Sequence, residues 1–350
     1  MDAELQPFVD DALDEIEYVT GDASTKWGAE RVKDGHPAPF PLTYVEIGNE
    51  DGFDGSHSYD GRFAQFFDAI KAKYPNLKCI ATAGGKDNIG SRVKLTQRVP
   101  DAIDEHYYRT AGEMEDDAAH YDSYDRNGPK VFVGEWATRE GGPTTNMNAA
   151  LGDAAWMTGM ERNSDVVILA SYAPLFVNVN PGGMEWPSDL IGYDALSSYG
   201  SPSYYAQKMF NTNLGTSVLA VAGENIPTRT WQPPTPRAKR DQPPSAPPAP
   251  KELPTLFYVA TKDSKTGAIY LKVGNTADSS QVVQIKLNGT TSVAPDGTLI
   301  SLSAPNPTDT NSITEPMKIV PVTTKAAGLG TTFTETFAPY SINVLQININ

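Results

Sequence analysis

The chain has 350 residues, 39% of them hydrophobic and 20% charged, a composition typical of a globular protein long enough for two domains. Asp and Glu outnumber Lys and Arg by 43 to 28, and the net charge of −15 disfavours nucleic acid as a partner because the phosphate backbone is itself anionic. A single cysteine, Cys79, excludes an intrachain disulfide and a cysteine-rich metal site, and no apolar run reaches the roughly 18 residues of a membrane span.

The first part of the chain, residues 1–215, alternates short apolar runs with helical patterns. In residues 61–73, for example, aromatic and aliphatic side chains recur at spacings of three and four, and residues 148–162 show a similar pattern. Strands that alternate with helices predict βαβ units and a parallel sheet, either doubly wound or part of a (β/α)8 barrel. The predicted strands are 16–19, 42–47, 79–83, 102–106, 131–135 and 166–171.

The second part, residues 216–350, has a different pattern. It contains a proline-rich segment at 232–254, which we expect to be extended and without a packed core of its own. Apolar residues then alternate with polar ones in five runs, and Asn288-Gly289 and Asp296-Gly297 are typical turn pairs. These features predict an antiparallel β-sandwich with strands near 256–259, 269–273, 281–287, 298–302 and 341–347.

Two of the predicted barrel strands end in a carboxylate. Glu50 follows the strand 42–47, and Glu135 ends the strand 131–135 with Trp136 directly after it. Catalytic groups of (β/α)8 barrels project from the carboxyl ends of the strands, and two carboxylates are what glycosidic cleavage requires. Trp136 either stacks on a sugar ring or packs in the core. His106, at a third strand end, either hydrogen-bonds a carboxylate or sugar hydroxyl or is a buried, satisfied histidine.

Other chemistries have little support in the sequence. The four histidines show no metal-ligand spacing, and there is no Gly-x-Ser-x-Gly elbow and no phosphate-binding glycine loop. We therefore expect a site without a metal or an organic cofactor.

Four ordered segments resemble the glycoside hydrolase family 51 α-L-arabinofuranosidases, especially the fungal type. They are 44–51, 104–108, 133–137 and 172–179, and the segments 311–316 and 337–341 resemble the C-terminal sandwich of that family. The resemblance implies a retaining hydrolase that releases terminal α-L-arabinofuranosyl residues from arabinoxylan, arabinan or pectin side chains. It implies Glu50 as general acid/base and Glu135 as nucleophile.

The resemblance also suggests residues that bind the substrate. Asn49 is expected to donate to the sugar 2-hydroxyl, and His106 or Tyr108 to orient Glu135. Asn178 and Trp186, on the long segment after the last barrel strand, are expected to line the pocket. Family members place the acid/base after strand 4 and the nucleophile after strand 7 of the barrel.

That numbering makes 42–47 strand 4, so that Glu135 ends strand 7, 166–171 is strand 8 and 16–19 is strand 3. Strands 1 and 2 then have no place before residue 16, and we expect an incomplete (β/α)8 barrel holding strands 3–8. Either the chain is truncated at its N-terminal side, or a second chain, such as another copy in a homo-oligomer, closes the barrel. The family pattern also has a bulky residue at the position of Gly52.

Alternative interpretations keep the same carboxylates. The substrate would be a β-xyloside or β-glucan, or the chain would be a non-catalytic fragment that only binds carbohydrate. Secretion is implied by the family resemblance, although residues 1–10 show no signal peptide.

Overall fold

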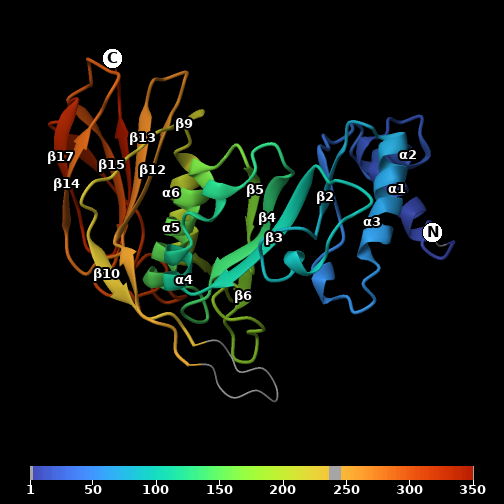
Figure 1. Ribbon diagram of the computed structural model, residues 1–350, viewed down its shortest axis with the longest axis horizontal. Coiled ribbons are helices and arrows are strands. Elements are labelled where there is room, and N and C mark those ends of the chain that lie inside the picture. The colour runs from blue at the N-terminus through green and yellow to red at the C-terminus, as the bar shows by residue number, and fades with distance from the viewer. Residues whose placement is uncertain (1–2, 236–245, 350) are drawn as a thin grey trace. The chain divides into compact units, whose positions relative to one another are not determined.

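The computed structural model describes residues 3–235 and 246–349 (Figure 1). The chain divides into two compact units, and the first consists of Met1–Tyr107, Asp125–Glu135 and Val166–Ser171, whereas the second consists of Tyr108–Tyr124, Trp136–Asp165 and Tyr172–Asn350. The domain boundary at 215/216 stays a prediction.

A parallel sheet of five strands lies mainly in the first unit. Its strands follow chain order, and Val45 pairs with Cys79 while Ile80 pairs with Ala102. Buried residues such as Cys79, Val131 and Val133 make the strands apolar, as parallel strands covered on both faces require. The sheet is an incomplete (β/α)8 barrel, as predicted. Its strands are β1 (Tyr44–Ile47), β2 (Lys78–Ala81), β3 (Ala102–Arg109), β4 (Lys130–Thr138) and β5 (Val167–Tyr172).

The predicted strand at 16–19 is wrong, because these residues belong to helix α1 (Gln6–Thr20). The buried side chains of α1, Val9 and Ile16, are seven residues apart, and Leu13 packs against the same core, so the apolar residues follow a helical period. Pro7 in the first turn also suits a helix start. The sheet that the described residues form therefore corresponds to family strands 4–8.

Helices α1, α2 (Lys26–Lys33) and α3 (Tyr59–Lys73) belong to the first unit. The predicted helical pattern at 61–73 is confirmed by α3, which contributes Tyr59, Phe63 and Ile70 to a core that also contains Ile47 and Cys79. Burial raises the pKa of the Cys79 thiol to about 11, as expected for an inert core cysteine. Two single turns, η1 (Asp51–Phe53) and η2 (Gly90–Arg92), follow β1 and β2.

The second unit contains helices α4 (Ala111–Asp116), α5 (Met147–Arg162) and α6 (Pro202–Thr212) and the turn η3 (His120–Ser123). Helix α5 confirms the pattern at 148–162 and is buried along most of its length, since it packs against α4, α6 and strand β12 (Leu256–Lys262). A small sheet is formed by β6 (Phe176–Asn178), β7 (Ile191–Tyr193) and β8 (Ser198–Gly200).

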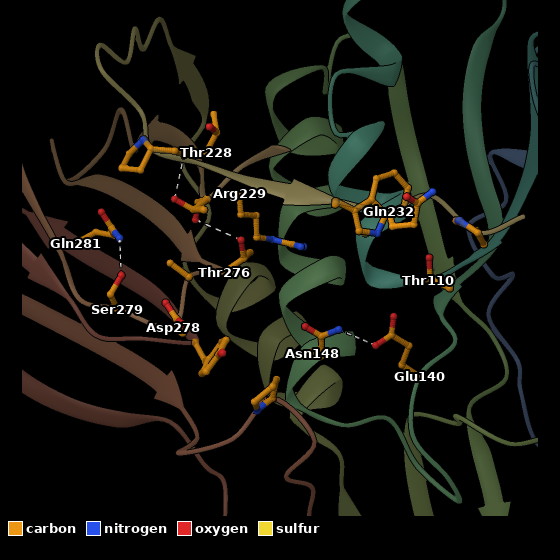
Figure 2. Close-up of a pocket in the computed structure, with 18 residues that line it drawn as sticks. Thr110, Glu140, Asn148, Thr228, Arg229, Gln232, Thr276, Asp278, Ser279 and Gln281 are labelled. Atoms are coloured by element: carbon orange, nitrogen blue, oxygen red, sulfur yellow. Dashed lines mark hydrogen bonds between the residues drawn. The ribbon is translucent and has the colours of Figure 1, made fainter. Parts of the chain in front are cut away.

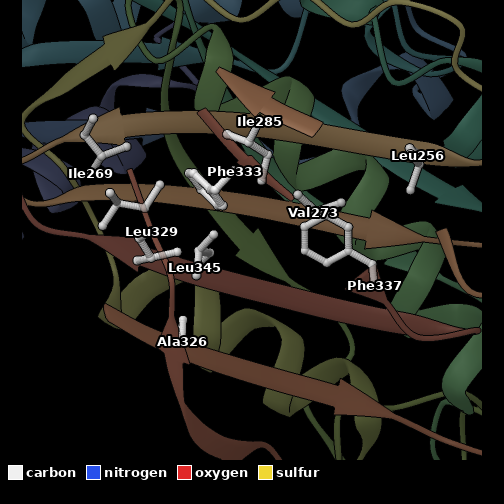
Figure 3. Close-up of a cluster of buried hydrophobic side chains, with 10 residues drawn as sticks. Leu256, Ile269, Val273, Ile285, Ala326, Leu329, Phe333, Phe337 and Leu345 are labelled. Carbon is white, nitrogen blue, oxygen red and sulfur yellow. The ribbon is translucent and has the colours of Figure 1, made fainter. Parts of the chain in front are cut away.

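The predicted antiparallel sandwich forms the rest of this unit. Its larger sheet has the order β16-β15-β18-β13-β12-β9, and β14 pairs with β17. Figure 3 shows the side chains between these layers, among them Phe333, Phe337 and Leu345. The strands are β9 (Ser217–Leu219), β12 (Leu256–Lys262), β13 (Ile269–Asn275), β14 (Gln281–Lys286), β15 (Asp296–Ser303), β16 (Val322–Ala327), β17 (Thr332–Phe337) and β18 (Ser341–Ile347).

One of the two predicted turn pairs lies in a strand. Gly289 has a φ of 80° outside any strand, as a turn requires, but Asp296 and Gly297 begin β15 and pair with Ala327 and Ala326. A Cβ at Gly297 would lie 2.3 Å from the carbonyl oxygen of Gln346, so this glycine permits the close approach of β18.

The proline-rich segment 232–254 is only partly described, because residues 236–245 lie outside the described part of the chain. At its end, β11 (Lys251–Pro254) pairs antiparallel with β10 (Thr228–Trp231) and buries Leu253, so this end does contribute to a packed core. None of the helices in the described ranges has the length and hydropathy of a membrane span.

Candidate active site

Three of the predicted site residues meet at the sheet of the first unit. The imidazole Nδ1 of His106 lies 2.9 Å from Glu50 Oε1 and 3.5 Å from Glu135 Oε2. One carboxylate oxygen of each glutamate and the imidazole nitrogen all lie within 4.8 Å of one another. The turn after β1 and strand β4 therefore bring two half-buried carboxylates to the same ring nitrogen of one histidine.

Glu50 is positioned by a tight turn at the end of β1. Gly48 has a φ of 100° and Glu50 a φ of 51°, so two residues in the left-handed region reverse the chain around Asn49. Asp51 holds this turn, since its Oδ2 accepts hydrogen bonds from Asn49 N at 3.0 Å and Thr82 Oγ1 at 2.8 Å. Left-handed non-glycine residues are concentrated at functional sites, which makes the Glu50 conformation notable.

The loop after β2 explains why position 52 is a glycine. A Cβ at this position would lie 2.1 Å from the backbone carbonyl oxygen of Ile89, so the bulky residue of the family pattern has no room here.

His106 is held from its other side by Asp104. The two residues are two apart in β3 and therefore point to the same face of the strand. The imidazole Nε2 lies 2.6 Å from Asp104 Oδ2, and Asp104 Oδ1 accepts the backbone N–H of Gly134 at 2.9 Å. Asp104 is not among the site residues predicted from the sequence, although the period of two along 102–109 places it on the same face as His106.

The surroundings favour the charged form of His106. Burial by itself lowers the pKa of the imidazole, but its hydrogen bonds to Asp104 and Glu50 and the negative charges of Asp104 and Glu135 outweigh burial and raise that pKa to about 9. The histidine is therefore an imidazolium at neutral pH, and both ring nitrogens donate.

The same trio is the one group among the described His, Cys, Asp and Glu residues whose donor atoms are close enough to hold a metal ion. Metal coordination requires a neutral imidazole, because the protonated ring has no free lone pair. A metal ion bound here would have to displace the imidazole proton that faces the two carboxylates.

The backbone of β3 is held by a second overlooked residue, Asp87. Its side chain is 4% exposed, and its Oδ2 accepts the backbone N–H of His106 at 3.0 Å while Oδ1 accepts that of Gly90 at 2.6 Å. On the other face of β3, the buried carboxylate of Glu105 accepts hydrogen bonds from Lys86 N and Tyr107 Oη, each at 2.8 Å. The strand that carries His106 is thus fixed on both faces.

Four predicted substrate-binding residues belong to the second unit. Tyr108 and Trp186 are 37% and 55% exposed, and the guanidinium carbon of Arg139 lies 4.9 Å from the Tyr108 ring centre and 5.9 Å from that of Trp186. Trp136 is only 2% exposed and packs edge-on against Tyr172. Asn178 is half-buried at the end of β6, and its Oδ1 accepts hydrogen bonds from Asn180. Asn49, in the first unit, is exposed.

Comparison with known proteins identifies the family. Residues 1–126 match the family model described as α-L-arabinofuranosidase 1 domain, and residues 119–341 match that of the α-L-arabinofuranosidase C-terminal domain. An arabinose-bound GH51 α-L-arabinofuranosidase of known structure is 33% identical, with a TM-score of 0.81 over 99% of this chain and 52% of that chain. The chain belongs to the glycoside hydrolase family 51 α-L-arabinofuranosidases.

Curated members of this family span more than this chain does. α-L-Arabinofuranosidase A of Aspergillus kawachii is 34% identical over 349 residues, which cover 98% of this chain and 49% of the relative. The extracellular exo-α-L-arabinofuranosidase of Streptomyces chartreusis is 40% identical over 230 residues, which cover 65% of this chain and 27% of the relative. The chain thus spans about half or less of the length of these arabinofuranosidases.

Proposed function

We propose that this chain carries the catalytic carboxylates of a retaining α-L-arabinofuranosidase, with Glu135 as nucleophile and Glu50 as general acid/base. The observation that supports this most is the spacing of the two side chains, whose nearest oxygens are no more than 4.8 Å apart. Retaining glycosidases hold their carboxyl groups roughly 5–5.5 Å apart, whereas inverting enzymes leave room for a water at roughly 6.5–9.5 Å.

The reaction proceeds in two steps. In the first, a Glu135 oxygen attacks the anomeric carbon of the arabinofuranosyl group, the bond to the leaving oxygen breaks, and Glu50 gives that oxygen its proton. In the second, Glu50 takes a proton from water, the water oxygen bonds to the anomeric carbon, and the bond to Glu135 breaks. Two inversions at the anomeric carbon give net retention, and the residues end in their starting protonation states.

His106 acts in this scheme as a positioning residue. Its Nδ1–H faces Glu50 and Glu135, and Asp104 fixes the ring from the opposite nitrogen, at 2.6 Å. A carboxylate that orients a histidine through its second nitrogen is a common arrangement in enzyme sites. The imidazolium also stabilises the negative charge of Glu135 before attack, and that of Glu50 once its proton has passed to the leaving oxygen.

The substrate is proposed to be a terminal α-L-arabinofuranosyl group of arabinoxylan, arabinan or pectin side chains. Asn49 adjoins Glu50 and is available to donate to the sugar 2-hydroxyl, while Tyr108, Trp136, Asn178 and Trp186 are the proposed substrate contacts of the second unit. The net charge of −15 supports a neutral polysaccharide rather than nucleic acid as the partner. Secretion is proposed from the resemblance to the extracellular enzyme of Streptomyces chartreusis. A homo-oligomer is compatible with this function.

An aryl α-L-arabinofuranoside tests the assignment. Glu135→Ala should abolish turnover, and azide should restore it with formation of the β-azide. Glu50→Ala should slow the hydrolysis of substrates with natural leaving groups about 10²–10⁴-fold and largely spare that of substrates with activated leaving groups. Added azide should then give the α-azide as product. Glu30→Ala, which removes an exposed carboxylate of α2, is the control. The proposal fails if the chain does not turn the substrate over, or if Glu135→Ala keeps wild-type activity.

A further inference from the structure

The second unit contains a cavity that shares no residue with the carboxylate site. Its volume is about 640 Å³, within the roughly 300–1,000 Å³ that small-molecule sites occupy. In Figure 2, Asp278, Ser279 and Gln281 lie on one side and Thr110, Glu140 and Asn148 on the other, with Arg229 extending between them. The cavity lies between the sandwich, strand β10 and the first turns of helices α4 and α5 with the residues just before them.

The lining combines hydrogen-bonding side chains with flat apolar surfaces. Amide and hydroxyl groups come from Asn148, Gln232, Ser279 and Gln281, and the ring faces come from Trp231, Tyr340 and prolines 227, 234 and 307. A sugar ring needs this combination, because its edge carries hydroxyls that pair with amides while its C–H face packs on an aromatic ring. The amide nitrogens of Asn148, Gln232 and Gln281 already donate hydrogen bonds within the chain, which fixes their side chains, and the amide oxygens are acceptors for the hydroxyls of a sugar.

Strand β10, which forms one wall, is anchored to helix α4. Arg229 pairs at 2.6 Å with Glu115, whose side chain is fully buried, and Lys251 of the adjoining β11 pairs with Asp116 at 2.5 Å. The Trp231 ring packs where Gly112 lacks a side chain, since a Cβ at Gly112 would lie 2.2 Å from the indole Nε1. The aromatic wall is therefore built into the fold and does not depend on a ligand for its position.

The charges of the lining decide which ligand fits. Arg229 is already paired with Glu115, whose pKa burial raises to about 7, and the two oxygens of Glu140 already accept hydrogen bonds from Ala111 N at 2.8 Å and Asn148 Nδ2 at 2.7 Å. Asp278 adds another negative charge at an exposed position. An anionic ligand would meet the carboxylates of Glu140 and Asp278, and the guanidinium of Arg229 in the lining is already paired with Glu115, whereas an uncharged ligand avoids this repulsion.

We propose that this cavity is a second carbohydrate-binding site, which takes a short neutral oligosaccharide by stacking on Trp231 and hydrogen bonding to Asn148 and Gln281. The choice of a pentose oligosaccharide as the probe rests on the proposed function. The inference that a sugar binds here rests on the residues that line the cavity. A site of this kind holds a polymer by a segment that the carboxylates do not cleave and so raises the local concentration of cleavable groups.

Linear xylotetraose is the probe, because it carries no arabinofuranosyl group and survives in the presence of the wild-type chain. Its binding is measured by calorimetry and by saturation-transfer NMR. Trp231→Ala should weaken binding at least about tenfold, and Gln281→Ala about fivefold. Gln284→Ala, which removes an exposed glutamine of the same strand outside the cavity, should leave binding unchanged. Tetragalacturonate, an anionic counterpart, should bind far more weakly than xylotetraose.

Trp231→Ala removes a packed ring, so a second variant protects the test against loss of folding. Ser279→Trp adds bulk at an exposed position of the lining and should block the cavity while circular dichroism stays that of the wild type. Absence of xylotetraose binding to the wild type, or equal binding to the wild type and Ser279→Trp, overturns the proposal. Failure of the chain to hydrolyse an aryl arabinofuranoside contradicts the proposed function and leaves this binding result standing.

Discussion

The backbone N–H of Gly134 donates to Asp104 Oδ1 at 2.9 Å, and a Cβ at Gly134 would lie 2.1 Å from the same oxygen. The residue before Glu135 thus makes room for the carboxylate that holds His106. Because β3 and β4 share this contact, the position of His106 depends on the absence of a side chain on the neighbouring strand.

Gly134→Ala should therefore displace Asp104 and weaken both folding and turnover. Inserting a methyl group into a packed site typically costs about 1–3 kcal/mol, which urea unfolding of the purified chain measures. Turnover of an aryl arabinofuranoside should fall because His106 loses its fixed partner. Gly55→Ala is the matched control, since a Cβ there meets nothing within 4 Å. Equal stability and turnover of the two variants would contradict the role of this contact.

His106 should make the stability of the protein depend on pH. Its pKa is raised from 6.5 to about 9 in the folded state, so the folded protein binds the proton more tightly than the unfolded chain. The resulting stabilisation, on the order of 3 kcal/mol, is complete below pH 6.5 and is lost as the pH rises through about 9. Unfolding by urea at about pH 6 and about pH 9.5 measures it in the wild type and in His106→Asn.

The difference in unfolding free energy between these two proteins should shrink at the higher pH. Groups that titrate in this range without interacting with His106 contribute to both proteins and cancel in the comparison. Glu46 does not cancel, because burial and Asp104 raise its pKa to about 8 while His106 lowers it, so the comparison is made in a Glu46→Gln background. A difference that stays constant with pH would show that His106 is neutral in the folded protein.

Asp87 should be needed to hold the backbone of β3. Asp87→Ala leaves the buried N–H groups of Gly90 and His106 without their acceptors, at a cost of about 1–3 kcal/mol for each such group. Asp87→Asn keeps one acceptor oxygen and should be less destabilised than Asp87→Ala. Thermal unfolding of both variants, together with KM and kcat, checks this, and identical behaviour of the two would argue against hydrogen bonding as the cause.

In the second unit, Lys272 and Glu161 form a buried pair. The Lys272 Nζ lies 2.6 and 2.7 Å from the two Glu161 oxygens and donates to the Phe210 carbonyl at 2.9 Å, and its side chain is fully buried. Glu161→Gln leaves a buried ammonium without its counter-charge and should destabilise the chain by about 3–5 kcal/mol.

The double variant Glu161→Leu with Lys272→Met should recover much of that loss, because the pair is replaced by apolar side chains. Glu30→Gln removes one partner of the exposed Glu30–Lys33 pair and should change stability by less than about 1 kcal/mol. Denaturant unfolding of the four proteins gives the comparison. A double variant less stable than Glu161→Gln would contradict this account.

Much of the fold could be read from local patterns. The strands at 42–47, 79–83, 102–106, 131–135 and 166–171 are apolar runs bounded by polar residues, and five of the six predicted barrel strands are found. The sixth, at 16–19, failed because a four-residue window does not distinguish a strand from the end of a longer helical pattern. The predicted turn at Asp296-Gly297 was wrong for a related reason. In sequence, a glycine that makes room for a neighbouring strand looks the same as a turn glycine.

The sequence by itself was sufficient to predict the two carboxylates as a pair, because Glu50 and Glu135 each follow or close an apolar run; in the structure Glu50 lies in the turn after β1 and Glu135 lies within β4. It also determined the change from βα units to an antiparallel sandwich, through the period of the apolar residues. Only the tertiary structure decided that His106 lies between the carboxylates, that Asp104 and Asp87 hold it, and that Gly134 and Gly52 must lack side chains. These are contacts between residues far apart in the chain, and they depend on strand register and close packing, which no local pattern encodes.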